Sequence, residues 1–157
     1  MAGGFTIIPD QLPAFRDFLI ENVTQQLAEH DPTPEIQIDA IATVQGARAD
    51  MVKLVTRNVG PFGVGNPEPI FALSNVRVWQ VDVLKEKHIR VLLSDWEGTG
   101  RMKAMLFGGV GTELGEAILT QKQLPFHFAG QFQVNSWQGR ESVEFHISDG
   151  TLAMETS

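Results

Sequence analysis

The chain has 157 residues, of which 43% are hydrophobic, and its formal net charge is −7. This hydrophobic content is typical of a folded domain rather than of a disordered segment. Because the sequence contains no cysteine, disulfides, cysteine metal sites and cysteine nucleophiles are excluded, which fits a reducing compartment such as the cytoplasm. No apolar run approaches the ~20 residues that span a bilayer, and we expect no membrane association.

The first part of the chain predicts a short α/β segment. Residues 5–8 form a β-prone run. Apolar residues spaced by three and four between Leu12 and Leu27 then predict one face of a helix, which Asp31 and the prolines after it end. From Ile36 to Ala40 apolar and polar residues alternate, which predicts a half-buried strand.

A second helix is predicted over residues 47–58. Its apolar residues are expected to face inward, and they are Met51, Val52, Leu54 and Val55. The glycine that follows, Gly60, is the residue type that commonly ends a helix.

Residues 60–69 contain three glycines and three prolines. Proline fixes φ and removes a backbone donor, and glycine permits positive φ, so this segment forms neither a helix nor a central strand. The composition predicts an ordered, turn-rich connector, although taken alone it favours an ordinary interdomain loop. It is not a dinucleotide-binding fingerprint, because no strand–turn–helix pattern surrounds it.

Beyond the connector the pattern changes to strands. Three strands are predicted within residues 71–107, a short helix at residues 112–119 and a hairpin over residues 126–147. Four phenylalanines share the inward parity of the hairpin and are assigned to the core: Phe126, Phe128, Phe132 and Phe145. This is the element order of an OB-fold. The predicted fold class is therefore α+β, a short α/β segment followed by a five-stranded OB-fold β-barrel with one short helix.

Two motifs resemble a known family. The sequence GPFGVGNPEPIF, at 60–71, resembles the segment that joins the core to the oligonucleotide-binding barrel in RecJ-type exonucleases. These are single-strand-specific DNA nucleases of the DHH phosphoesterase superfamily. The sequence NSWQGRESVE, at 135–144, is similar to the last hairpin of that barrel. The residues that carry the two motifs are Gly60, Pro61, Phe62, Gly63, Gly65, Asn66, Pro67, Pro69, Asn135, Trp137 and Gly139.

The resemblance implies that the chain is a C-terminal fragment. Residues 1–59 would end the DHH-associated domain, 60–69 would be the connector, and 70–157 the OB-fold domain. The implied function is single-stranded-DNA binding, as the non-catalytic portion of a cytoplasmic 5′-to-3′ exonuclease in DNA repair and recombination. The family's metal-binding aspartates and its Asp-His-His sequence do not occur here. We therefore expect no catalytic or metal site in this chain, and Mg²⁺ or Mn²⁺ only in a DHH core. That core, and possible further repair proteins, are the expected partners.

Single-strand binding requires cations along a groove and flat side chains on which bases stack. Residues 1–59 carry four basic and eight acidic groups, whereas residues 77–103 carry six basic and four acidic ones. A local basic patch of this kind can bind a phosphate backbone on an acidic domain. The DNA-binding candidates are Arg77, Trp79, Lys85, Lys87, His88, Arg90, Arg101 and Lys103. Trp96 and Trp137 are further stacking candidates, although Trp137 is interpreted as structural because it belongs to the hairpin motif.

The same residues can also be explained without DNA binding. The cations also fit a solubilising surface, and the tryptophans also fit packing at a barrel rim. The negative net charge and the absence of tyrosine favour a structural or protein-interaction module without nucleic-acid binding. A self-contained enzyme is disfavoured, because the four histidines are scattered and no nucleophile motif occurs.

Overall fold

The computed structural model describes residues 6–29, 35–60 and 67–153. The chain divides into two compact units, Met1–Glu35 and Ile36–Ser157. Within the described residues, no helix is both long enough and apolar enough to cross a membrane.

The first unit contains a 3-10 turn, η1 (Pro9–Gln11), that leads into the helix α1 (Leu12–Glu29), as the apolar spacing predicts. The β-prone run before it does not form a strand over residues 6–8, because the described residues of this unit include no strand to pair with. Phe5 lies outside the described residues. The apolar side chains Phe18 and Val23 are exposed on α1.

The second unit begins with β1 (Ala40–Ala42), which pairs in parallel with the start of β2 (Phe71–Leu84). The strand predicted over residues 36–40 is thus displaced toward the C-terminus. Asp39 marks the start of pairing, because its backbone N–H donates to the carbonyl of Ile70 and its carboxylate accepts from the N–H of Ile70, both at 2.8 Å. Ile36 and Ile38 precede that point and remain exposed.

The helix α2 (Ala49–Val59) ends at Gly60, as predicted. Its inward face is narrower than the sequence suggests. Val52 is 8% exposed and Val55 is half-buried, whereas Met51 and Leu54 are 56% and 58% exposed. Side chains three and four apart share one face of a helix, so the face that contains Val52 and Val55 packs on the barrel and the other two residues point away. The inward assignment of Met51 and Leu54 is therefore wrong.

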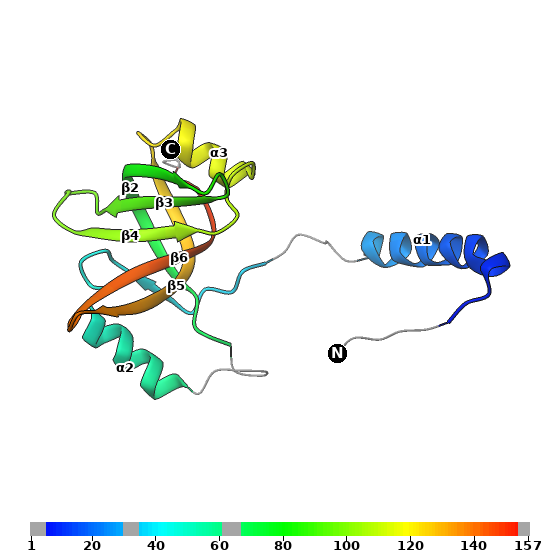
Figure 1. Ribbon diagram of the computed structural model, residues 1–157, viewed down its shortest axis with the longest axis horizontal. Coiled ribbons are helices and arrows are strands. Elements are labelled where there is room, and N and C mark those ends of the chain that lie inside the picture. Colours follow the sequence, from blue (N-terminus) through cyan, green and yellow to red (C-terminus); the bar gives the residue numbers. More distant parts are fainter. Residues whose placement is uncertain (1–5, 30–34, 61–66, 154–157) are drawn as a thin grey trace. The chain divides into compact units, whose positions relative to one another are not determined.

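Five strands close into a barrel with an OB-fold order (Figure 1). They are β2, β3 (His88–Ser94), β4 (Arg101–Leu106), β5 (Pro125–Trp137) and β6 (Arg140–Leu152). β2, β3 and β4 are antiparallel neighbours, β4 pairs in parallel with β6, β6 pairs with β5, and β5 closes the ring on β2. The predicted fold class is confirmed. Figure 1 also shows that α2 and α3 (Glu113–Thr120) lie at opposite ends of the barrel.

The barrel is filled by one parity of each strand. Phe126, Phe128 and Phe145 are at most 1% exposed, and the rings of Phe126 and Phe128 stack with centroids 5.2 Å apart. Phe132 is half-buried and packs its ring 5.0 Å from that of Phe145. The predicted phenylalanine core is confirmed, and each fully buried ring contributes roughly 1.5–3 kcal/mol relative to exposure.

The division into compact units lies earlier in the chain than the expected domain boundary at residue 59. The cause is physical, because β1 extends the barrel sheet and α2 contacts β5 and β6. The assignment of residues 1–59 to a DHH-associated domain, with a separate barrel domain from residue 70, stays a prediction. Most of the Gly/Pro connector, residues 61–66, lies outside the described residues.

Candidate nucleic-acid interface

Four side chains from three elements meet on the outside of the barrel. Arg77 and Trp79 come from β2, Trp96 from the loop after β3, and Arg101 from the start of β4. They point outward because the neighbouring residues of opposite parity, such as Val78 and Met102, fill the core. The register pairs Arg77 with Ser94 and Ser94 with Arg101, so the two arginines flank one position of β3.

Each tryptophan of this group lies against an arginine. The Cζ atom of Arg77 is 3.9 Å from the ring centroid of Trp96, and that of Arg101 is 4.5 Å from the ring centroid of Trp79. Such cation–π contacts stabilise exposed rings by roughly 0.5–1 kcal/mol each. Trp79 and Trp96 nevertheless remain 59% and 53% exposed. We call these four residues, Arg77, Trp79, Trp96 and Arg101, the Trp–Arg cluster.

The loop that carries Trp96 is organised by the side chain of Asp95. One carboxylate oxygen accepts from the N–H of Thr99 at 2.8 Å. The other accepts from the Thr99 hydroxyl at 2.9 Å and from the N–H of Gly100 at 2.8 Å. Desolvation raises the pKa of Asp95, but the hydrogen bonds from Thr99 and Gly100 outweigh it and hold the pKa below its ordinary value of 3.8. The ionised carboxylate therefore holds the loop, and with it the position of Trp96.

A shallow cavity of about 360 Å³ lies at the Trp–Arg cluster. Arg77, Trp79 and Trp96 line it together with Lys122, a cation that is not among the candidates predicted from the sequence. Lys122 arrives there because Pro125 pairs with Arg77 across β2 and β5. The sequence alone does not show that Lys122 lies near Arg77, because this proximity depends on the β2–β5 pairing that closes the barrel.

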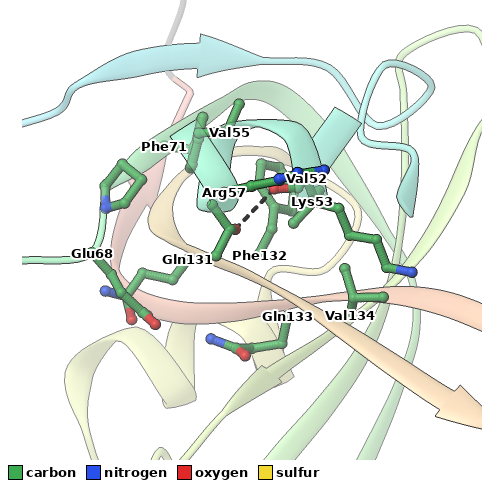
Figure 2. A pocket seen from close by; sticks show the side chains of 12 residues that line it. Val52, Lys53, Val55, Arg57, Glu68, Phe71, Gln131, Phe132, Gln133 and Val134 are labelled. Atoms are coloured by element: carbon green, nitrogen blue, oxygen red, sulfur yellow. Dashed lines mark hydrogen bonds between the residues drawn. The ribbon is translucent and has the colours of Figure 1, made fainter. Parts of the chain in front are cut away.

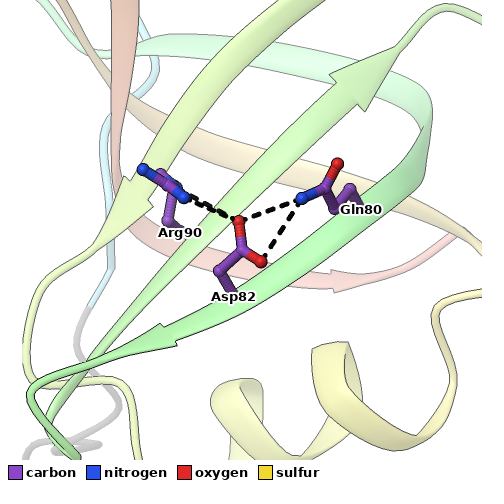
Figure 3. A network of polar contacts seen from close by, with 3 residues as sticks. All are labelled: Gln80, Asp82 and Arg90. Carbon is purple, nitrogen blue, oxygen red and sulfur yellow. Dashed lines mark hydrogen bonds and ion pairs between the residues drawn. The ribbon is translucent and has the colours of Figure 1, made fainter.

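Arg90 lies on the outward face of β3 and is already paired. Its guanidinium donates to the Asp82 carboxylate on β2 at 2.9 Å, and Gln80 donates to the same carboxylate (Figure 3). The hydrogen bond from Arg90, followed by that from Gln80, lowers the pKa of Asp82. Arg90 therefore offers less uncompensated charge than the sequence suggests. Lys103, opposite Leu92 in the β3–β4 register, makes no ion pair within the described residues.

The remaining candidates lie at the other end of the β2–β3 hairpin. Lys85 and Lys87 belong to the turn between the strands, and Lys85 has a φ of 52°. His88 begins β3, and its Nδ1 accepts from the N–H of Gly108 at 2.9 Å. The structure thus joins Arg77, Trp79 and Arg101 in one cluster and separates the two lysines and His88 from it along the strands.

The hairpin motif residues build the turn between β5 and β6. Asn135 pairs with Ser142, and Gly139 has a φ of 76°, which favours glycine. Trp137 is 76% exposed within this chain, and its structural role stays a prediction. Of the connector motif, Pro67 and Pro69 precede β2 and Gly60 caps α2. The motif residues Pro61, Phe62, Gly63, Gly65 and Asn66 lie outside the described residues.

A larger pocket of about 540 Å³ lies between α2 and β5. Figure 2 shows Phe71, Phe132 and Val55 among its lining residues, with Arg57 and Lys53 contributed by α2. The rings of Phe71 and Phe132 are 5.0 Å apart. The ammonium group of Lys53 donates a hydrogen bond to the Glu141 carboxylate of β6. Phosphate binding thus has weaker support here than at the Trp–Arg cluster.

Metal-ligating side chains do not gather in the described part of the chain. Among those residues, no group of three or more histidine, cysteine, aspartate or glutamate side chains lies together in a way that could hold a metal ion. The Trp–Arg cluster offers flat rings and fixed cations.

Comparison with known proteins gives a consistent picture. A family model, the RecJ OB domain, matches residues 38–149. The single-stranded-DNA-specific exonuclease RecJ of Bacillus subtilis (strain 168) is 22% identical over 153 residues, which are 98% of this chain and 19% of that protein.

Solved structures with the same fold include two of RecJ from Thermus thermophilus. The complex with Mn²⁺ has a TM-score of 0.63 at 22% identity and covers 94% of this chain and 20% of that one. The complex with Mg²⁺ has a TM-score of 0.59 at 23% identity and covers 94% and 21%. The chain spans about a fifth of the length of each of these relatives.

Proposed function

The chain belongs to the RecJ OB domain family, and on this premise we propose that it binds single-stranded DNA as the non-catalytic portion of a RecJ-type exonuclease. The Trp–Arg cluster is the observation that carries the proposal. Sequence-independent binding of single strands combines aromatic side chains, on which bases stack, with cations that track the phosphates. Trp79 and Trp96 supply exposed rings, and Arg77, Arg101 and Lys122 supply charge beside them.

The arginines serve two purposes in this proposal. Each guanidinium lies against one tryptophan and fixes the orientation of its ring. A guanidinium that stacks on an aromatic ring still has N–H donors at its edge, and these bind phosphate oxygens. One residue thus prepares both the stacking surface and the phosphate contact, which lowers the ordering cost of binding.

The catalytic part of the proposed function lies outside this chain. We propose that the strand held by the barrel is cut by a DHH core, which is the partner that holds Mg²⁺ or Mn²⁺. The relatives named above support this, since one is a single-stranded-DNA-specific exonuclease and two solved RecJ structures are complexes with these ions. The same proposal includes 5′-to-3′ digestion in DNA repair and recombination, other repair proteins as partners, and a cytoplasmic location, which the absence of cysteine fits.

A titration followed by tryptophan fluorescence tests the binding. Stacking of bases on Trp79 and Trp96 changes the emission of both indoles, so we expect saturable quenching by a single-stranded oligonucleotide and much weaker quenching by a duplex. Higher salt should weaken binding, because phosphate contacts release counterions. Quenching that is equal for both DNA forms, or absent at low salt, would contradict the proposal.

One observation favours a second candidate function. The net charge of −7 opposes long-range attraction of DNA, which is expected for a structural or protein-interaction module. This second function would be favoured if the chain bound no single-stranded DNA at low salt while circular dichroism showed that its fold was intact.

A further inference from the structure

Phe107 is an exposed ring that the Trp–Arg cluster does not account for. It follows β4 directly and is 56% exposed. Along β4, Met102, Ala104 and Leu106 face the core, so Arg101 and Lys103 have the outward parity, which Phe107 continues. Met105 has the same parity but is only 9% exposed. The ring therefore lies on the same outer surface of β4 as Arg101, at the opposite end of the strand.

Two histidines hold this ring. The centroid of Phe107 is 5.5 Å from that of His88 on β3 and 5.0 Å from that of His146 on β6, at interplanar angles of 74° and 86°. Both imidazoles are themselves anchored. His88 accepts from the N–H of Gly108 at 2.9 Å, and His146 Nε2 lies 3.1 Å from a carboxylate oxygen of Glu144. Edge-to-face contacts of this kind fix the plane of the phenylalanine while more than half of its surface stays in water.

Three lysines lie along the surface that leads to Phe107, with the carboxylates of Glu86 and Glu144 among them. The N–H of Val110 donates to the carbonyl of Lys87 at 3.2 Å, which attaches the loop after Phe107 to the β2–β3 turn. Lys85 and Lys87 thus lie at the Phe107 end of the barrel face. Lys103 lies between the two ends on β4, and Figure 1 shows β3 and β4 side by side along this face. None of these three lysines belongs to the Trp–Arg cluster.

We propose that Phe107 is a second base-stacking position for single-stranded DNA, with Lys103 and Lys87 contacting the phosphates that lead to it. The six residue-to-residue steps from Arg101 to Phe107 correspond to about 20 Å along the strand. A single strand running along β4 would thus engage the Trp–Arg cluster at one end and Phe107 at the other. This inference rests on the proposed function. It adds the course of the strand along β4 and the requirement that the strand be long enough to reach Phe107.

Oligothymidylates of about 4 to 16 nucleotides test the proposal, since this range covers the usual site sizes of OB-folds. Three variants are compared with the wild type: Phe107→Leu removes the ring, Phe107→Tyr keeps it, and Ile41→Ala removes another exposed apolar side chain, on β1. We expect Phe107→Leu to bind the shortest ligands as the wild type does. On the longest ligands it should bind roughly 5- to 150-fold more weakly. Phe107→Tyr and Ile41→Ala should follow the wild type at every length.

A second measurement uses only the wild-type chain. An oligonucleotide that carries 5-iododeoxyuridine at each position in turn is photo-cross-linked, and we expect a cross-linked peptide that contains Phe107 for one register. The second stacking position is overturned if Phe107→Leu binds as tightly as the wild type at every length and no such cross-link forms. If Trp79→Ala still weakens binding in that case, the proposed function is left intact. Failure of the wild type to bind any oligonucleotide overturns both.

Discussion

Each exposed tryptophan of the Trp–Arg cluster depends on an arginine from another element. Trp79 on β2 lies under Arg101 of β4, and Trp96 in the β3–β4 loop lies under Arg77 of β2. At the scale of single residues, the candidate function thus depends on two cross-strand pairs. The rings of Trp79 and Trp96, and the Asp95 carboxylate that positions Trp96, are the groups on which this function depends.

Replacing Trp79 by alanine should weaken single-stranded DNA binding by ~1–3 kcal/mol, the usual contribution of one stacked base. Stability should change little, because the side chain is 59% exposed. Fluorescence titration and urea denaturation measure the two effects separately. Trp137→Ala, at the tip of the other hairpin, is the matched control and should leave affinity unchanged. A decrease in stability with unchanged affinity would show that Trp79 only packs.

Asp95→Asn should destabilise the β3–β4 loop at neutral pH and not in acid. The folded-state pKa of Asp95 lies below its ordinary value of 3.8. The ionised group therefore adds stability that is complete above this value and is lost as the pH falls through the lower folded-state pKa. Urea midpoints at pH 7 and at a pH well below 3.8 measure the difference. Glu97→Gln in the same loop is the control, since Glu97 makes no hydrogen bond within the described residues. An Asp95→Asn effect that persists in acid would contradict the assignment.

At the scale of elements, the barrel requires a close approach of β5 and β6. The register shifts between Ala129 and Gly130, and a Cβ added to Gly130 would lie 2.0 Å from the carbonyl oxygen of His146. Only glycine permits this approach without a backbone shift. The bulge thereby preserves the ladder that continues to Phe145 and His146.

Gly130→Ala should therefore destabilise the fold by about 1–3 kcal/mol or more, the usual cost of overpacking. Chemical denaturation followed by circular dichroism measures the change. Ser136→Ala, at an exposed position of the same strand, is the control and should stay within about 0.5 kcal/mol of the wild type. Equal stability of Gly130→Ala and Ser136→Ala would contradict the tight β5–β6 contact.

Much of the element order could be predicted from the sequence, because periodicity depends on neighbours along the chain. The two-residue alternation around Phe126 and Phe145 predicted the core phenylalanines correctly. Partners remote in sequence escaped prediction. The Arg101–Trp79 contact and the place of Lys122 depend on barrel closure, and the ion pair of Arg90 depends on the β2–β3 register. The prediction assigned too many residues of α2 to its inward face, because apolar content alone does not show which side of the helix contacts the barrel.

At the scale of the whole molecule, residues 36–157 form one compact unit and should fold without the first 35 residues. We expect this truncation to give β-rich circular dichroism and a cooperative melt. A shorter chain that starts at residue 70 lacks β1 and α2 and uncovers Phe71 and Phe132, so it should melt lower, by about 4–8 °C for each kcal/mol of stability removed. An aggregated 36–157 chain, or a residue-70 chain that is equally stable, would contradict the described unit.

The whole molecule is acidic, so binding of an anionic strand has to come from the local cations of the barrel face. The salt dependence of binding therefore tests directly whether these cations hold the strand. The affinity for a single-stranded oligonucleotide is measured across a series of salt concentrations for the wild type and for Arg77→Ala combined with Arg101→Ala. We predict that the double variant binds more weakly and that its slope of log K against log salt is smaller by roughly 1.4, which is about 0.7 for each phosphate that an arginine no longer neutralises. An unchanged affinity and an unchanged slope would contradict the assignment of the Trp–Arg cluster as the binding site.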